Sequence, residues 1–315
     1  MESRVREVEK TWARAGVLHL RHLLAVTIVL GMASAPAWAQ QAAAPASRWW
    51  GQEERNETFD KAKFSHPTEI TNPWFPMKPG LRMTFEGSSL TEEGTTVKRR
   101  MQINMTDLTK TVGGIKTVVS YDLDWAKGGL VEAELECLAQ DDDGNVWILG
   151  EYPEEYDDGN GVITGNPAWF HGIAGALAGI LVPAQPALGT PSFSEGWGPA
   201  VEYNDRGRVD SLGVTVCVPV DCYKDAVVIA ESSADEVDAE QLKYYVKGVG
   251  NVGVRWRGAK DSEHQILWLT KTETLDAKGI EKLRTSALAL DKKAKGRNKT
   301  YAQTSAIEAP AAGTH

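Results

Sequence analysis

The sequence contains few of the residues on which most catalytic and metal centres depend. It has six histidines and three cysteines in 315 residues, and beyond residue 39 the histidines are His66, His171, His264 and His315. It has no G-x-S-x-G, H-E-x-x-H or Walker motif, and no G-x-G-x-x-G that opens a helix. We therefore expect no cofactor and no metal, although a centre built from His66, His171 and a carboxylate stays open. On this evidence we favour a protein that is not an enzyme, without excluding an enzyme.

Long hydrophobic runs are also scarce. One run of about ten residues, Leu23 to Met32, follows five Lys/Arg and precedes Ala37-Trp-Ala39, an arrangement typical of a secretory signal peptide. A membrane-spanning helix needs roughly 20 apolar residues. We expect residues 1–39 to be a signal peptide and residues 40–63 a flexible leader. The mature chain is then periplasmic or secreted, with no transmembrane span, and no cysteine near the cleavage site offers a lipid anchor.

Basic residues are outnumbered in the mature chain. Beyond residue 39 the sequence has 29 Lys/Arg and 40 Asp/Glu, a net charge of about −11. Phosphate backbones and anionic lipid headgroups repel a surface of this sign. We therefore exclude nucleic acid as a partner and expect no docking on an anionic membrane through the bulk of the chain.

Two of the three cysteines are close in sequence. Cys217 and Cys222 flank Val-Pro-Val-Asp, and in an oxidising compartment such a pair across a bend closes a small disulfide loop. Two free thiols are the alternative, and a zinc site would need two further ligands that do not stand nearby. Cys137 lies in an alternating strand and is expected to be a buried small hydrophobe.

The pattern that is present is β-like. The 30 glycines and 14 prolines are spread along the chain, and apolar and polar residues alternate with period two in many segments. The predicted fold is mainly β, with one strongly curved antiparallel sheet or partial barrel whose apolar face packs inward while the acidic face meets water. The predicted strands are Leu81–Glu86, Val118–Trp125, Val131–Cys137, Val146–Tyr152, Ser211–Cys217, Tyr223–Ser232, Leu242–Lys247, Gly253–Arg257 and Gln265–Glu273.

The domain organisation follows from this pattern. Residues 64–275 form a single β-rich domain, interrupted near residues 164–181 by a Gly-rich loop or short helix. Residues 276–315 form a short basic helix and a disordered tail, with docking to a membrane or a partner as the alternative. The helix is predicted from the spacing of Ile280, Leu283, Ala287, Leu288 and Leu290.

Carboxylates are the abundant reactive group. Glu132, Glu134 and Glu136 alternate along one strand and project from one face, while Glu151 lies on the strand predicted to pair with it. A solvated sheet face is the simplest interpretation. A glycan-active enzyme using Glu132, Glu136 and Glu151, or a calcium-stabilised module, are the alternatives. The loop Asp141–Asn145 resembles half of an EF-hand loop, but Val146 and Tyr152 replace its glycine and glutamate.

Aromatic residues suggest a binding surface. Nine tryptophans lie beyond residue 39, and indole rings line apolar cavities and stack on sugars as well as filling cores. Trp125, Trp147 and Trp169 are the ligand-binding candidates. The leading hypothesis is an exported, non-catalytic protein that binds an apolar or aromatic ligand, or a component of the cell envelope, in the concavity of the sheet.

Four motifs occur in a fixed order. They are Thr71-Asn-Pro-Trp-Phe-Pro-Met-Lys-Pro-Gly80, Asp143-Gly-Asn-Val-Trp147 with Gly150-Glu151, Leu181-Val-Pro-Ala-Gln-Pro-Ala-Leu-Gly189, and Lys243-Tyr-Tyr-Val-Lys-Gly-Val-Gly250. Over residues 66–256 the chain resembles a family of uncharacterised bacterial secreted proteins and lipoproteins. It departs from that family in the Cys217/Cys222 pair and in having no lipobox. The resemblance implies export and one β-rich domain, and it implies no activity.

Overall fold

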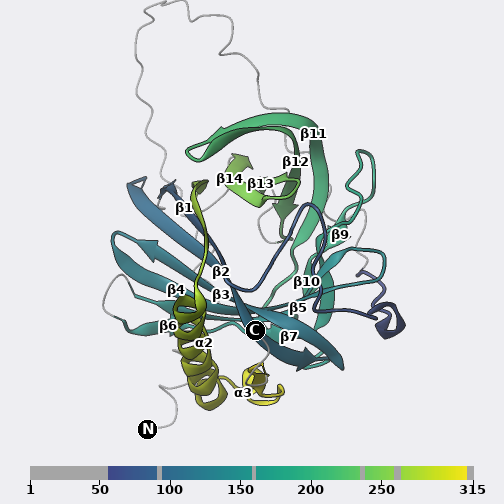
Figure 1. Ribbon diagram of the computed structural model, residues 1–315, viewed down its shortest axis with the longest axis vertical. Helices are drawn as coiled ribbons and strands as arrows, with labels where there is room; N and C mark the ends of the chain where they lie inside the picture. Colours follow the sequence, from purple (N-terminus) through teal and green to yellow (C-terminus); the bar gives the residue numbers. More distant parts are fainter. Residues whose placement is uncertain (1–55, 91–93, 158–160, 235–237, 259–263, 311–315) are drawn as a thin grey trace, which may run out of the picture. The chain divides into compact units, whose positions relative to one another are not determined.

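A computed structural model describes residues 56–90, 94–157, 161–234, 238–258 and 264–310 (Figure 1). These residues belong to one compact unit, Pro45–His315. The predicted signal peptide, residues 1–39, and the first part of the predicted leader lie outside the described residues. None of the helices in the described ranges has the length and apolarity needed to cross a membrane.

Most of the described chain is β-strand. The long strands are β1 (Leu81–Leu90), β2 (Thr96–Val112), β3 (Ile115–Ala126), β4 (Gly129–Gln140), β5 (Val146–Tyr156), β11 (Arg206–Val218), β12 (Asp221–Ser232), β13 (Ala239–Val246), β14 (Gly250–Gly258) and β15 (Ile266–Thr274). The short strands are β6 (Ile163–Gly165), β7 (Trp169–Phe170), β8 (Leu177–Val182), β9 (Phe193–Ser194), β10 (Gly196–Trp197) and β16 (Ile307–Glu308). The helices are η1 (Lys61–Lys63), α2 (Ala277–Arg297) and α3 (Lys299–Ala302). The mainly β prediction is confirmed.

One long strand, β2, escaped the sequence prediction. Its buried positions include Gln102, Asn104, Thr106 and Lys110, so polar side chains occupy places where the period-two test expects apolar ones. Of the two alternatives for residues 164–181, a Gly-rich loop or a short helix, the structure has no helix there: the segment contains β7, parts of β6 and β8, and the turn at residues 171–175. Its glycines suit turns better than helix, because glycine loses the most backbone freedom on ordering.

The strands form one antiparallel sheet with the order β10-β8-β5-β4-β3-β2-β1-β15-β14-β13-β12-β11-β9. The two ends of this order are joined by consecutive residues, because β9 pairs with β11 and β10 pairs with β8. The residue between β9 and β10 is Glu195. The sheet therefore curves back toward its own beginning without closing into a barrel, as the curved-sheet prediction required.

The alternation in β4 separates two faces. Ala133, Leu135 and Cys137 are buried in a core that also contains Leu290 and Ala294 of α2. Because neighbouring side chains on a strand point to opposite faces, the glutamates between them point to the inner face. Asp276 caps the start of α2, and its carboxylate accepts a hydrogen bond from the Gly279 amide at 2.7 Å. The C-terminal helix is confirmed, and it covers the outer face of the sheet.

The segment after α2 differs from the predicted disordered tail. Tyr301 of α3 is fully buried, and its hydroxyl donates to Asp291 Oδ1 at 2.6 Å. Lys110 Nζ, also buried, donates to the carbonyl of Ser305 at 2.6 Å, and Ile307 pairs with Lys110 in the sheet. The tail is ordered because it supplies partners for the buried Lys110 ammonium and the partly buried Asp291 carboxylate, and burying a charge without a partner is costly.

The end of the predicted leader is also part of the fold. Asp60 caps η1, accepting from the Ala62 amide at 3.0 Å. The ring of Phe59 packs edge-on against Trp147, with centroids 5.6 Å apart. Residues 56–63 are therefore not a flexible leader, because an aromatic side chain anchors them to the outer core.

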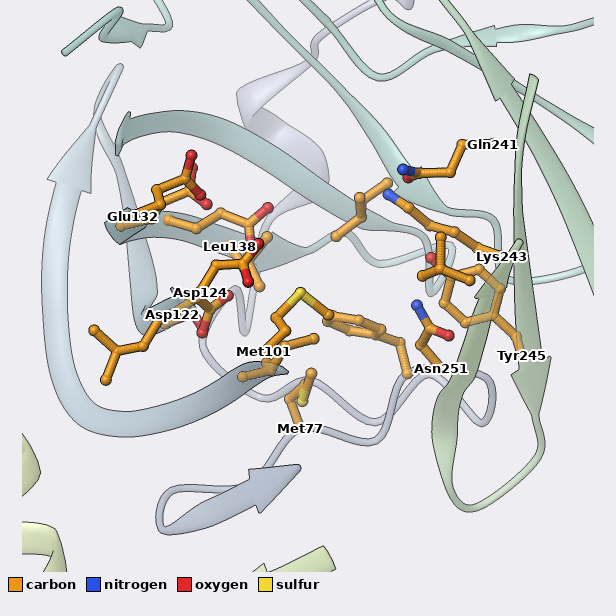
Figure 2. A pocket seen from close by; sticks show the side chains of 18 of the residues that line it. Met77, Met101, Asp122, Asp124, Glu132, Leu138, Gln241, Lys243, Tyr245 and Asn251 are labelled. Atoms are coloured by element: carbon orange, nitrogen blue, oxygen red, sulfur yellow. The ribbon is translucent and has the colours of Figure 1, made fainter. Parts of the chain in front are cut away.

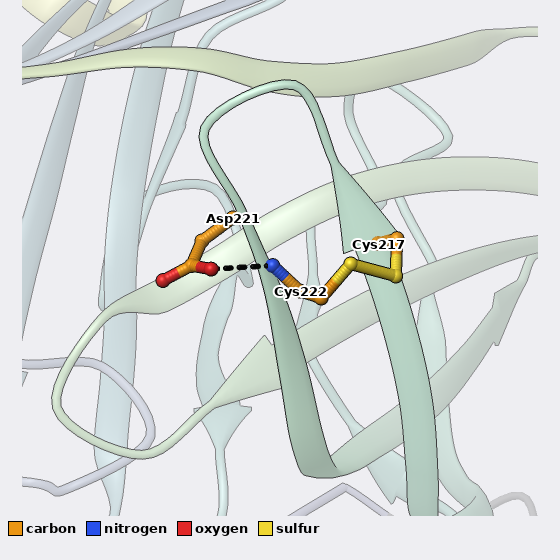
Figure 3. Close-up of a disulfide and its surroundings, with 3 residues drawn as sticks. All are labelled: Cys217, Asp221 and Cys222. Atoms are coloured by element: carbon orange, nitrogen blue, oxygen red, sulfur yellow. Dashed lines mark hydrogen bonds between the residues drawn. A yellow bond between two sulfur atoms is a disulfide. The ribbon is translucent and has the colours of Figure 1, made fainter.

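The predicted disulfide joins Cys217 to Cys222 across the turn between β11 and β12 (Figure 3). The two residues are directly paired in the ladder, and the Asp221 side chain accepts a hydrogen bond from the Cys222 amide at 2.7 Å. Cys137 is buried and free, and burial raises the pKa of its thiol to about 12. The bridge ties one hairpin, while Cys137 is an unreactive core residue.

We expect unfolded, unreduced mature protein to show one reactive thiol, from Cys137. Replacing both Cys217 and Cys222 by Ser should remove about 2 kcal/mol of stability, because the closed loop is short, and should lower Tm by several degrees. Thiol counting and thermal unfolding measure both quantities. Three reactive thiols in the wild type would contradict the assignment.

Candidate functional site

The inner face of the sheet encloses a cavity of about 200 Å³. Five of its lining residues are carboxylates from β3 and β4: Asp122, Asp124, Glu132, Glu134 and Glu136. Figure 2 shows acidic side chains on one side of the cavity and Gln241, Lys243, Tyr245 and Asn251 on the other. These two groups of strands lie far apart in the strand order, so curvature of the sheet brings them together. We call the five carboxylates the acidic wall.

Cross-strand register sets the acidic wall. Asp122 stands opposite Glu134 and Asp124 opposite Glu132 in the β3–β4 pair. Glu136 stands opposite Glu151 in the β4–β5 pair. Directly opposed residues have Cβ atoms about 4.5–5.5 Å apart, and like charges at that distance repel. The arrangement is therefore electrostatically costly in the absence of protons or cations.

Two cations from the described residues reach this region. Arg99 forms an ion pair with Asp124 Oδ2, and Lys243 forms one with Glu231, a residue of β12 next to the cavity. Asp122 Oδ1 accepts hydrogen bonds from Ser120 Oγ at 2.6 Å and from the Asn104 amide at 3.0 Å. These contacts hold individual acids in place but leave carboxylates in clear excess.

The pKa values of the acidic wall are raised, so these carboxyl groups keep their protons to higher pH than usual. Loss of hydration raises the pKa of Asp122 to about 7. Desolvation and the nearby Asp124 raise that of Glu132 to about 8. Desolvation, followed by the charge of Glu151 for Glu134 and of Asp122 for Glu136, raises the pKa of both glutamates well above the ordinary value. Part of the acidic wall is thus protonated near neutral pH.

Two carboxyl pairs share protons at the edge of the cavity. Glu134 bonds to Glu151, whose pKa desolvation raises to about 7, and the Trp169 indole N–H also donates to Glu151 Oε1, at 2.9 Å. Glu195 and Glu231 form the second pair. Because an ionised carboxyl can only accept, a hydrogen bond between these two needs a proton held by one of them.

Apolar residues complete the cavity. The loop before β1 contributes Phe75 and Met77, and β2 contributes Met101 and Ile103. Leu138, Leu181 and Val254 also line it. Methionine side chains are flexible and polarisable, and they adapt to ligands of different shape. The cavity is amphipathic, because its lining combines the acidic wall, the polar side chains that face it, and these apolar residues.

The sequence candidates Glu132, Glu136 and Glu151 do lie together, but not on the water-facing surface that was the simplest interpretation. The structure corrects that interpretation: the apolar residues of β4 pack under α2, so the glutamates lie on the opposite, cavity side of the sheet, where they are partly exposed. Glu132 and Glu136 line the cavity. Glu151 lies beside it, bonded to Glu134 and Trp169.

The three candidate tryptophans are dispersed, and none of them lines this cavity within the described part of the chain. Trp147 is buried in the outer core, and its indole N–H donates to Asp141 Oδ2 at 2.8 Å. Trp125 is half-buried under the Arg100 guanidinium, 4.9 Å from the ring centroid. Trp169 stacks on Tyr203 with centroids 4.8 Å apart. Their role in ligand binding stays a prediction, and this cavity does not support it.

The described residues contain no group of three or more His, Cys, Asp or Glu side chains placed to hold a metal ion. In the acidic turn after β4, Asp141 accepts from the Asn145 amide at 2.8 Å and Asp142 from the Ser65 amide at 3.0 Å. Asp143 pairs with Lys63 at 2.8 Å. These carboxylates bind different protein donors instead of surrounding one point, which explains the acidic turn without calcium.

The residues of the site that the sequence analysis missed are of two kinds. Asp122 and Asp124 alternate in a predicted strand, so their shared face could have been found from the period alone. Glu195, Glu231 and Lys243 are single charged residues in separate segments of the chain. Only the curvature of the sheet brings them to one place.

Comparisons with known proteins add little information about function. No family model matches the chain, and no curated protein matches it. A candidate exported protein with a YmcC-like fold from Bacteroides fragilis is 12% identical with a TM-score of 0.33, over 64% of this chain and 98% of that one. A candidate lipoprotein from Parabacteroides distasonis is 10% identical with a TM-score of 0.34, over 64% and 99%. Likeness at this level carries no argument about function.

The raised carboxyl pKa values predict that stability falls as pH rises. The folded protein holds protons that the unfolded chain has lost above its ordinary carboxyl pKa, so unfolding becomes easier between about pH 4.5 and about pH 8. Glu154 and Asp210, whose pKa values are lowered, titrate below this window. His171, with a lowered pKa, acts in the opposite direction as a single group.

We therefore expect Tm to drop by at least about 5 °C between about pH 5 and about pH 8.5. Glu134→Gln, which copies the protonated form, should raise Tm at the higher pH and change little at the lower one. Exposed Glu86→Gln is the matched control. A Tm that stays constant or rises over this interval would contradict the proposed protonation.

Proposed function

We propose that this is an exported protein of the cell envelope that binds a small amphipathic ligand in the cavity of the curved sheet, without chemical conversion. The observation that supports it most is that one cavity combines an acidic wall with apolar lining residues. Small-molecule sites are concave and largely apolar, with a few polar groups that fix orientation. Buried carboxyls cost stability, and such costs are concentrated at functional sites.

The placement of the acids favours binding over glycan hydrolysis. Glycosidases place two carboxyl groups on either side of the scissile bond, about 5–9.5 Å apart. Here all five lining carboxylates come from adjacent strands β3 and β4. The facing side supplies Lys243, Gln241 and apolar residues. A sugar bond in the cavity would therefore meet lining carboxyls from one side only.

Export is supported by features outside the cavity. The signal-like pattern of residues 1–39 ends in Ala37-Trp-Ala39. The disulfide between Cys217 and Cys222 fits an oxidising compartment. Neither feature depends on the identity of the ligand.

Export predicts a processed chain. Full-length protein produced in a bacterial host with a secretory pathway should be recovered outside the cytoplasm with Gln40 as its first residue. Intact-mass measurement reads this directly, and a substitution of the cleavage motif, Ala37→Lys, should prevent processing. Recovery of unprocessed chain from the cytoplasm would contradict this part of the proposal.

Binding predicts that occupying the cavity blocks ligands. Ile103 lines the cavity from β2, and Ile103→Trp should fill much of the space at a cost of about 1–3 kcal/mol. We expect at least one compound from a panel of small amphipathic molecules to raise Tm of the wild type by several degrees at saturation. The same compound should have no effect on Ile103→Trp.

The control is Leu212→Trp, which places the same ring on a partly exposed position of β11 and should leave ligand stabilisation intact. If no compound raises Tm and Ile103→Trp by itself stabilises the protein, the cavity is a packing defect and the proposal is wrong.

A further inference from the structure

We infer that the ligand carries a protonated amine on a compact apolar body, and that the acidic wall receives the ammonium group while the methionines, Phe75 and Ile103 receive the body. This inference rests on the proposed binding function and names its ligand class.

Some acceptors of the acidic wall have no hydrogen-bond donor among the other described residues. No hydrogen bond from another described residue reaches the carboxyl of Glu132 or Glu136, and both line the cavity. Asp124 is 9% exposed, and its buried Oδ1 has no partner among the described residues. Buried polar atoms almost always have partners. A ligand rich in donors would satisfy the free acceptors on this side.

The charge of the cavity lining indicates which hydrogen-bond donor the ligand carries. The acidic wall has five carboxyl groups, and a ligand cation would take the place of protons that some of them hold. The cation among the residues that line the cavity is Lys243, which is already paired with Glu231. Arg99 is paired with Asp124. A neutral hydroxyl supplies one donor and no charge, whereas an ammonium supplies three donors and a positive charge. Hydrogen bonds between charged partners are about twice as strong as neutral ones.

The protein already accommodates an alkylammonium beside this wall. Lys243 extends from β13 toward the acidic side (Figure 2), and the carboxylates Glu231 and Glu195 together with Tyr245 raise its pKa well above the ordinary value against the opposing effect of burial. A ligand amine placed against Glu132 and Glu136 would meet a similar surrounding of carboxylates. The site therefore suits a second ammonium of the same kind.

Size limits the apolar body. A cavity of about 150 Å³ holds one benzene molecule, and this cavity is about 200 Å³. One ring, or a chain of similar volume, with a short arm to the amine fills such a space. Longer polyamines and lipids exceed it.

The test uses three probes with one apolar body and different heads. These are 2-phenylethylamine, 2-phenylethanol and phenylacetate, titrated into the mature protein by calorimetry at about pH 8, where the amine is still protonated. We expect the amine to bind at least about tenfold more tightly than the alcohol, and phenylacetate not to bind.

The variant Glu132→Gln/Glu136→Gln tests the acidic wall. It should weaken amine binding by about tenfold or more and change alcohol binding by less than about twofold. The control Glu69→Gln/Glu86→Gln removes two exposed charges and should change neither. Both double variants replace two carboxyl groups, and the exposed pair shows how much the loss of two surface charges by itself changes amine binding.

Each outcome has a distinct meaning. Equal binding of amine and alcohol, or tighter binding of phenylacetate, would overturn the inference and leave the binding function standing. Amine binding that is unchanged in Glu132→Gln/Glu136→Gln would also overturn it. Failure of all three probes in the wild type, with no effect of any amphipathic compound on Tm, would remove both the inference and the proposed function.

Discussion

The main energetic constraint on this structure is the free energy that it costs to dehydrate a cluster of carboxyl groups. Asp122, Glu132, Glu134, Glu136 and Glu151 share one inner face, and desolvation is the largest cause of every one of their raised pKa values. A core of apolar residues would be cheaper, because burying an isolated charge without a partner is among the most expensive events in folding. Shared protons and the ion pairs of Arg99 and Lys243 offset part of this cost. The remaining acceptors are the basis of the proposal that a ligand with hydrogen-bond donors binds here.

Packing on the outer face of the sheet offsets the energetic cost of the acids on its inner face. Leu135 and Cys137 of β4 pack against residues of α2, and Tyr301 of α3 fills the same core. Burial of each large apolar side chain contributes roughly 1.5–3 kcal/mol, and Arg297 Nη1 adds hydrogen bonds to buried Glu154 at 2.8 and 2.9 Å. The helix therefore stabilises the same strands whose other side carries the acids. Curvature of the sheet then converts a row of acids into one wall of a cavity.

The sequence was informative where local pattern decides the structure. Period-two segments such as Val131–Cys137 located most long strands, and the Cys217/Cys222 spacing predicted the disulfide. It failed where long-range packing decides. β2 was hidden because Asn104 and Lys110 occupy buried positions, and the order of Tyr301 and Ser305 depends on Lys110, a partner far away in sequence. The glutamates were found, but their orientation was not, because alternation shows that they share a face without showing which face is enclosed.

The most direct test of this account is a carbon-13 NMR titration of the Asp and Glu side-chain carboxyls in the ligand-free mature protein. The account predicts a group of carboxyl resonances, assigned to Asp122, Glu132 and Glu151 among others, with midpoints near 7 to 8. Titration of all these carboxyls near the ordinary values of about 4 would show that the acidic wall is fully hydrated, and would contradict the account.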